Sequence, residues 1–156
     1  MNQARRTFLK STGIAGAVAV AMFAGLLRTG KALAAEWNSA AFTAKTLDDA
    51  MKNSGYAGAA ASDDILIKVP EIAENGALVP VEATSNIPGT TSIAIFSDKN
   101  PNPLIAEFKF LNGAEPFISV RIKMAETAPV RIVVKADGKL YTASKDVKVT
   151  AGGCGG

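Results

Sequence analysis

Apolar and polar residues alternate along most of the chain after residue 65, which is the period expected of half-buried β-strands. Runs of this kind are separated by turn residues such as Pro88-Gly89. There are seven, at 65–69, 77–83, 91–96, 104–110, 118–124, 130–136 and 139–149. They predict an all-β domain, a seven-stranded antiparallel β-sandwich of immunoglobulin-like architecture in which each sheet has one solvated face.

One short helix is expected before the strands. Thr46 can cap its N-terminus, Asp48 and Asp49 lie in the positive first turn, and Gly55 can end it. The Ala/Gly-rich stretch 56–62 that follows is predicted to be a connector.

Two local features constrain the pairing of the strands. Asp137-Gly138 predicts a tight hairpin between the last two runs. Pro80 has no backbone N–H to donate, so its strand is expected to be an edge strand or to be bulged there.

The first 34 residues have the pattern of an export signal. Arg5 and Arg6 precede Phe8-Leu9-Lys10, an uncharged run over 11–27 and the small-x-small site Ala32-Leu33-Ala34. A membrane anchor is the alternative, but the run of 17 residues is shorter than the roughly 20 apolar residues that span a bilayer. The prediction is a twin-arginine signal peptide over 1–34, export of the folded protein to the periplasm together with a partner subunit, and a mature domain over 35–150.

Charge and composition exclude several kinds of protein. The whole chain has a net charge of +3, but residues 35–156 hold 12 basic and 14 acidic residues, a net charge of −2, so no basic patch for nucleic acid is expected. There is no histidine and one cysteine, which excludes a Ser-His-Asp triad, a His-bound metal and an internal disulfide. No cofactor is expected.

The C-terminus, 151–156, is where chemistry is expected. Cys154 is flanked by Gly152 and Gly153 on one side and by Gly155 and Gly156 on the other. Glycine has the widest φ/ψ range and no side chain to pack, so this segment is predicted to be a thin, flexible arm. Since no basic residue follows Lys148, nothing in the arm lowers the thiol's pKa, and activation is expected from whatever site receives it. The pattern favours a covalent carrier that serves as substrate for enzymes, with no catalytic residues of its own.

Other interpretations of this cysteine remain. A structural periplasmic β-module could dimerise through an intermolecular Cys154 disulfide, although a structural disulfide gains nothing from flexible flanking glycines. A labelling tail and a lipid-attached cysteine are weaker alternatives. An enzyme using Glu71 and Glu74 is also conceivable, but both are expected in a solvated turn beside Gly76.

The Gly-Gly-Cys-Gly-Gly terminus resembles that of the SoxY family, the Y subunit of the SoxYZ carrier of the thiosulfate-oxidising (Sox) system. The stretch 70–81, Pro-Glu-Ile-Ala-Glu-Asn-Gly-Ala-Leu-Val-Pro-Val, and the twin-arginine signal are similar to that family as well. The resemblance implies a heterodimer with a SoxZ-type subunit and sulfur intermediates held covalently on Cys154, as S-thiosulfonate and sulfane forms. It also implies transient docking to a c-type cytochrome complex that couples thiosulfate, a dimanganese hydrolase that releases sulfate, and a sulfane dehydrogenase.

Overall fold

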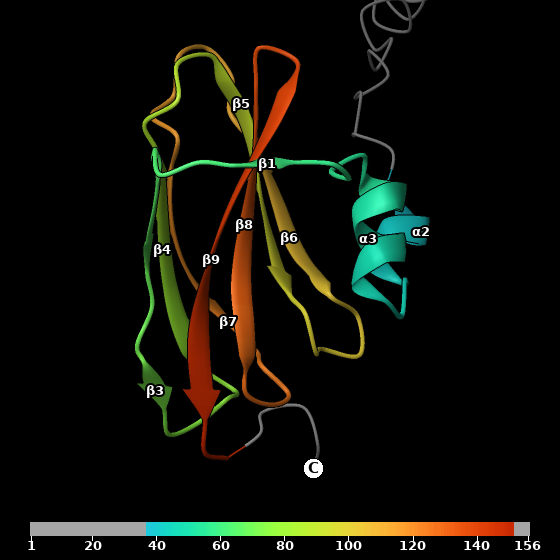
Figure 1. Ribbon diagram of the computed structural model, residues 1–156, viewed down its shortest axis with the longest axis vertical. Coiled ribbons are helices and arrows are strands. Elements are labelled where there is room, and N and C mark those ends of the chain that lie inside the picture. The colour runs from blue at the N-terminus through green and yellow to red at the C-terminus, as the bar shows by residue number, and fades with distance from the viewer. Residues whose placement is uncertain (1–36, 152–156) are drawn as a thin grey trace, which may run out of the picture. The chain divides into compact units, whose positions relative to one another are not determined.

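The computed structural model describes residues 37–151 (Figure 1). The described residues contain two helices, α2 (Ser39–Phe42) and α3 (Leu47–Ser54). Nine strands follow them: β1 (Ala60–Ala61), β2 (Ile65–Lys68), β3 (Ile72–Ala73), β4 (Val79–Ser85), β5 (Thr90–Ser97), β6 (Leu104–Lys109), β7 (Phe117–Ile122), β8 (Ala128–Ala136) and β9 (Lys139–Val149). The predicted signal peptide lies outside the described residues. Within them, no helix is long and apolar enough to cross a membrane.

The strands form two sheets that face each other. The larger has the order β1-β9-β8-β5-β6, with β3 also pairing with β9, and the smaller has the order β2-β4-β7. All pairings are antiparallel except those of β1 and β3 with β9, which are parallel. The predicted all-β sandwich is therefore confirmed, and the seven predicted strands correspond to β2 and β4–β9.

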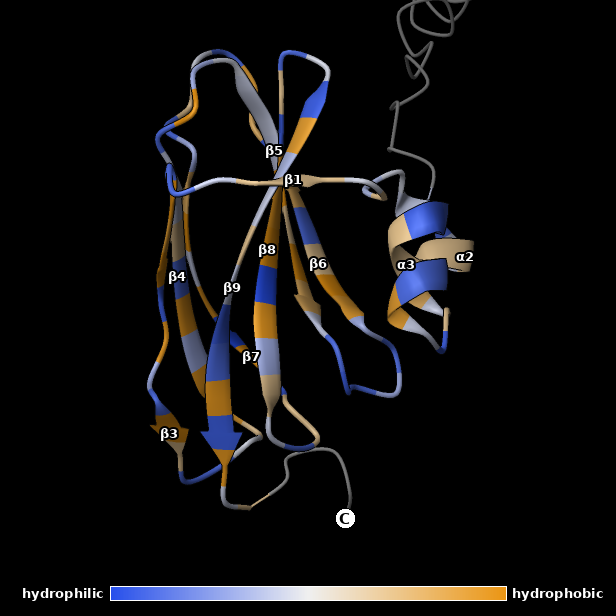
Figure 2. Cartoon of the chain, viewed as in Figure 1, coloured by the Kyte–Doolittle hydropathy of each residue, from blue (hydrophilic) through white to orange (hydrophobic). Residues whose placement is uncertain are grey.

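Alternating side chains from both sheets meet in the main core. In β4, Val79, Val81 and Ala83 are almost completely buried while the residues between them face outward. They pack against inward residues of β5 and β8, including Ile93 and Ile132. Figure 2 displays this alternation as bands of orange and blue along the strands. The alternation is the direct cause of the two-layer fold, because each sheet removes one apolar face from water.

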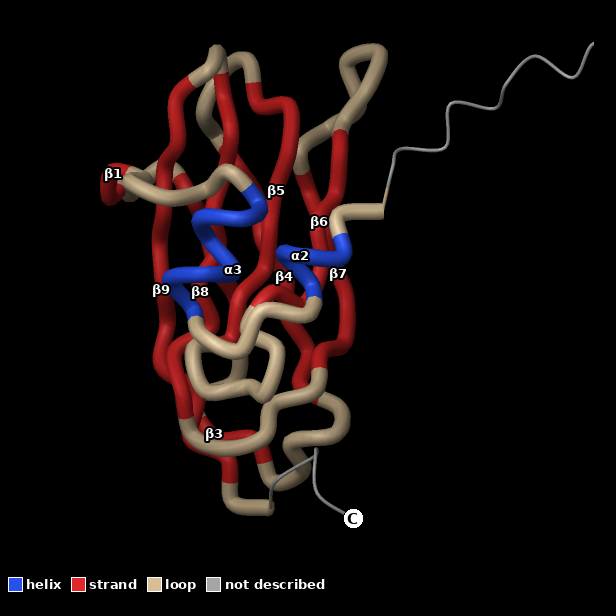
Figure 3. The backbone as a smooth tube through the Cα atoms, turned by 90° about the vertical axis from the view of Figure 1, so that its right-hand side faces the viewer, coloured by secondary structure: helices blue, strands red, loops and turns tan. Residues whose placement is uncertain are grey.

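The helices cover the outer face of the larger sheet (Figure 3). A second apolar cluster there joins Ala41 and Ala50 of the helices to Phe96 of β5 and Val133 of β8. Strand β5 is consequently buried on both faces from Ser92 to Ser97. The expectation of one solvated face holds for the smaller sheet and is wrong for this part of the larger one.

Tyr56 ties the end of α3 to this face. Its hydroxyl donates to Oε1 of Glu107 at 2.9 Å and shares a 2.8 Å hydrogen bond with Oγ of Ser92. Its ring meets that of Phe96 edge to face, with the ring centroids 6.2 Å apart. Burial raises the pKa of Tyr56 well above its ordinary value, although the hydrogen bond with Ser92 acts in the opposite direction.

The predicted helix is confirmed as α3. Thr46 is its N-cap and accepts a hydrogen bond from the amide of Asp49, and Gly55 ends it in the left-handed conformation at φ 75°. The sequence did not predict α2, whose four residues are too few to show a helical period. Nor did it predict β1, which falls in the stretch taken as a connector.

The hairpin prediction is confirmed and the edge-strand prediction is corrected. Asp137 and Gly138 both have positive φ, 47° and 76°, as a two-residue hairpin between β8 and β9 requires. Pro80 lies in β4, which is the central strand of its sheet. The proline is tolerated because β4 pairs with β2 only from Glu82 onward, so at Pro80 it has a neighbour on the β7 side alone.

Candidate functional site

The predicted carrier residues Gly152, Gly153, Cys154, Gly155 and Gly156 lie outside the described residues, which end at Ala151. The site that the structure describes is the stretch directly before them, at the end of β9. We call residues 148–151 the arm root and residues 71–76 the holding segment. Both lie at the lower end of the molecule in Figure 1, where β9 ends beside β3.

Backbone hydrogen bonds join the arm root to the holding segment. The amide of Lys148 donates to the carbonyl of Glu71 at 2.9 Å, and the amide of Thr150 donates to that of Ala73 at 3.1 Å. The amide of Gly76 then donates to the carbonyl of Ala151 at 2.7 Å. These bonds extend the parallel pairing of β3 with β9 past the end of the strand, so the chain is held up to Ala151.

Two threonine side chains add to this attachment. Oγ1 of Thr150 donates to the carbonyl of Glu74 at 3.1 Å. Thr127, from the β7–β8 loop, accepts from the amide of Val149 at 2.9 Å and donates to its carbonyl at 3.3 Å. A net hydrogen bond contributes about 0.5–1.5 kcal/mol, so together these bonds hold the arm root against thermal fraying.

The holding segment is itself tied to the core. Ala73 is buried, and the carbonyl of Gly76 accepts from the amide of Met124 at 2.7 Å. Oδ1 of Asn75 accepts from the amide of Ala77 at 2.8 Å, the contact that lets asparagine stabilise a turn. The point at which the arm begins is therefore fixed relative to the sandwich.

Charged groups near this end are solvent-exposed. Glu71 and Glu74 are both exposed, as the predicted solvated turn requires, and their backbone carbonyls hold the arm root. Lys99 and Glu126 are 3.9 Å apart and both exposed, so their pairing contributes little to stability.

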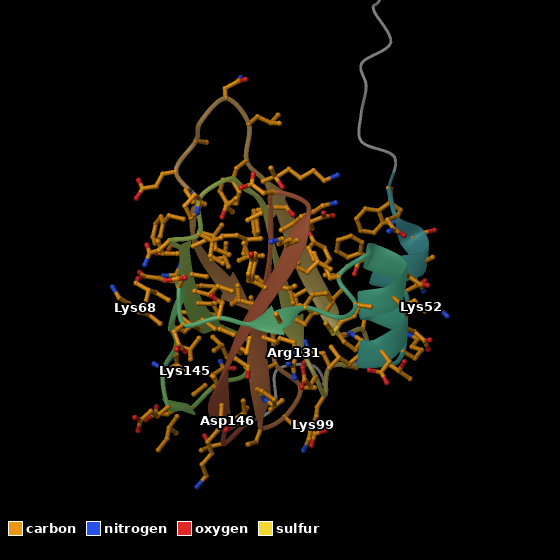
Figure 4. All side chains as sticks on the ribbon, turned by 45° about the horizontal axis from the view of Figure 1, so that its top comes forward. Lys52, Lys68, Lys99, Arg131, Lys145 and Asp146 are labelled. Atoms are coloured by element: carbon orange, nitrogen blue, oxygen red, sulfur yellow. The ribbon has the colours of Figure 1, made fainter. Side chains whose placement is uncertain are left out.

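Figure 4 places Lys99 and Asp146 towards this end, with Arg131 on the sheet above them. Arg131 contacts Asp98 through two hydrogen bonds, of 3.4 and 3.0 Å.

The described residues contain no cluster of three or more His, Cys, Asp or Glu side chains able to hold a metal ion. Every buried side-chain nitrogen or oxygen in this part of the chain has a hydrogen-bond partner. What the described residues at this end do provide is a hydrogen-bonded anchorage for a terminal segment.

Sequence reasoning missed the roles of Thr127, Thr150 and the backbone of the holding segment. Strand β3 has two residues, and a strand of that length leaves no alternation to recognise. The only available signal was the asparagine-glycine pair at 75–76, which marks a turn without indicating what the turn contacts.

Much of the chain is similar to known proteins. Residues 52–154 match the protein family described as "Sulfur oxidation protein SoxY", and the matched span ends on Cys154. The sulfur carrier protein SoxY from Chlorobium limicola f. thiosulfatophilum has a similar structure, with 46% sequence identity and a TM-score of 0.60 over 67% of this chain and 96% of that one. A superoxide reductase (neelaredoxin) from Ignicoccus hospitalis follows at 18% identity and a TM-score of 0.49, over 55% of this chain and 79% of that one. Among curated proteins, no sequence matches.

Proposed function

Because this chain belongs to the SoxY family of sulfur-oxidation proteins, we propose that it is a periplasmic carrier that binds thiosulfate-derived sulfur covalently on Cys154 and presents it to the enzymes of thiosulfate oxidation. The observation that carries the proposal is the family match over residues 52–154, since it extends to the chain's only cysteine. The fixed arm root supports it, because a carrier needs a tether that starts at a defined point. The protein acts as a substrate for its partner enzymes.

The proposed loading step is an oxidative coupling. The Cys154 thiol and thiosulfate form a sulfur–sulfur bond, giving the S-thiosulfonate R–S–S–SO₃⁻, one proton and two electrons. The electrons pass to a c-type cytochrome complex, which is the oxidant. Activation of the thiol falls to that complex, since the chain has no basic residue after Lys148.

Release of sulfate and further oxidation follow while the intermediate stays bound to the same carrier cysteine. A dimanganese hydrolase adds water across the terminal S–S bond, leaving R–S–SH on the carrier and releasing hydrogen sulfate. A sulfane dehydrogenase, which is the oxidant, converts R–S–SH and three waters to R–S–SO₃⁻ and seven protons and takes up the six electrons. The same carrier cysteine is thereby used in each step.

Delivery to the periplasm is part of the proposal. Arg5 and Arg6 with the following uncharged run support export in the folded state by the twin-arginine route. A SoxZ-type subunit, bound before export, completes the carrier as a heterodimer.

Intact-mass measurement tests the function. The protein is purified without reductant from cells grown on thiosulfate, and adducts of about 112 Da (thiosulfonate) or multiples of about 32 Da (sulfane) are expected. The matched control is Cys154→Ser, which should carry none. A wild-type preparation that is uniformly unmodified, or a Cys154→Ser strain that still oxidises thiosulfate, contradicts the proposal. In the second case a disulfide-linked structural module becomes the better account.

A further inference from the structure

The anchorage of the arm root limits how far the arm can reach. Hydrogen bonds hold the chain up to the carbonyl of Ala151, and Cys154 follows three residues later. At 3.3–3.6 Å per extended residue, the cysteine can lie at most about 10–11 Å beyond Ala151. The reach is thus short compared with the size of an enzyme.

A short tether brings the receiving enzyme against the sandwich. Reaction centres that exclude water lie in clefts below the protein surface. Because most of the arm's length is used in entering such a cleft, the rim around its mouth must come into contact with the residues that surround Ala151. Those residues include the holding segment, the turn that follows it and Thr127 of the β7–β8 loop.

This part of the surface carries exposed apolar side chains. Ile72 in β3 is 57% exposed and Leu78, directly before β4, is 62% exposed. Two of the six large exposed apolar residues in the described part of the chain therefore lie within seven consecutive positions, 72–78. Neither belongs to the buried core of the sandwich, so the fold does not account for them.

Resting on the proposed function, we propose that Ile72 and Leu78 form a docking surface for the rim of the enzyme channel that receives the arm. The occupant is an apolar rim around a channel mouth that admits a glycine-flanked cysteine. Two partly exposed side chains make a small contact, which suits the brief encounters that serial delivery requires. The short arm and the docking surface act together. Docking orients the arm towards the channel, and the length of the arm limits how far the sulfur of Cys154 can lie from the docking surface.

The test uses the complete heterodimeric carrier and separates docking from chemistry. In the first experiment, the coupling cytochrome complex loads the Ile72→Ser/Leu78→Ser carrier with thiosulfate, and kcat and KM are measured. In the second experiment, Cys154→Ser carriers, which cannot be loaded, are used with and without the two additional serines as competitive inhibitors of wild-type loading. The control is Leu111→Ser, which is 74% exposed and follows β6. It lies at the opposite end, because its neighbour Phe110 contacts Thr91 beside the far end of β8.

Removing both side chains is expected to raise KM and the inhibition constant about tenfold, with kcat and heterodimer formation unchanged. Leu111→Ser should behave as wild type. Equal KM values for the double variant and Leu111→Ser overturn the docking surface while the carrier function stands. Loss of the heterodimer in the double variant also overturns it, since the two residues would then contact the permanent subunit. Loading of Cys154→Ser would instead refute the carrier function itself.

Discussion

The amide of Gly76 donates a 2.7 Å hydrogen bond to the carbonyl of Ala151, the last described residue before the terminal glycines. Seventy-five positions separate the two residues in the sequence, yet this contact holds the chain up to the last described residue. In the proposed carrier function, the holding segment thereby sets the starting point of the arm, although none of its side chains has to react.

Thr150→Val should loosen the arm root. The change removes the hydrogen bond from Oγ1 to the carbonyl of Glu74, with an expected loss of about 0.5–1.5 kcal/mol of local stability. Hydrogen exchange at the amides of Gly76 and Thr150 should become faster. Thr91→Val is the matched control, because its Oγ1 also donates to a backbone carbonyl, that of Lys135, at 3.1 Å. Unchanged exchange at Gly76 in Thr150→Val would show that the backbone bonds alone hold the root.

Tyr56→Phe should destabilise the attachment of the helices. It leaves Ser92 and Glu107 without their shared partner, at a cost of about 1–3 kcal/mol, measurable by denaturant unfolding at neutral pH.

The same tyrosine should make stability sensitive to alkali. Because burial raises the pKa of Tyr56, the unfolded chain loses this proton near pH 10 while the folded protein keeps it. Its contribution is complete below about pH 10 and falls as the pH rises further. The loss of stability between neutral pH and about pH 11 should therefore be smaller in Tyr56→Phe than in wild type. Equal slopes in the two proteins would contradict the assignment.

Gly89→Ala should be more damaging than Gly58→Ala. Both glycines have positive φ, 71° and 78°, so both substitutions carry the strain of a left-handed alanine, about 1–2 kcal/mol. Only at Gly89 would the new Cβ overlap the carboxylate of Asp137, whereas Gly58 has open space around it. Thermal unfolding of both variants measures the difference, expected to be a further 1–3 kcal/mol or so. Equal losses would mean that the Asp137 side chain moves aside freely.

Gly153→Val or Gly155→Val should leave the sandwich intact and slow the loading of Cys154. A β-branched residue beside the sulfur widens the arm and restricts its φ/ψ range. The expected sign is lower kcat/KM for the coupling enzyme with an unchanged unfolding midpoint. Loading at the wild-type rate would remove the need for a narrow channel.

Replacing Arg5 and Arg6 with lysine should block export. The paired arginines are the feature by which the twin-arginine route selects a signal, so under the proposed export route the variant is expected to accumulate unprocessed in the cytoplasm. Cell fractionation and the N-terminal mass provide the measurement. Normal periplasmic accumulation would point to a different export route.

The parts of the fold that depend on local pattern could be predicted. Thr46, the two aspartates and Gly55 specify α3 within a few residues, and alternation specifies strands such as β4. The helix-covered face of the larger sheet was missed, although the unbroken apolar run 93–96 in β5 is typical of a strand buried on both sides.

The arm root could not be predicted for a different reason. It depends on main-chain groups of residues such as Ala73 and Gly76, and a backbone carbonyl or amide is present whatever the side chain. The tail's composition indicated a tether, while the point of attachment is a property of the three-dimensional arrangement alone.

β9 is the last strand before the C-terminal residues, so a force on the chain end acts on this strand first. β9 is paired with β8 at nine positions along its length and with β1 and β3 on its other side. A pull along the axis of β9, such as withdrawal of the proposed arm from a tight channel in that direction, would load all these hydrogen bonds in shear. They must yield together, whereas bonds loaded by peeling would yield one at a time. With the proposed function, a carrier pulled in this direction would be drawn out of an enzyme without the sandwich being unzipped.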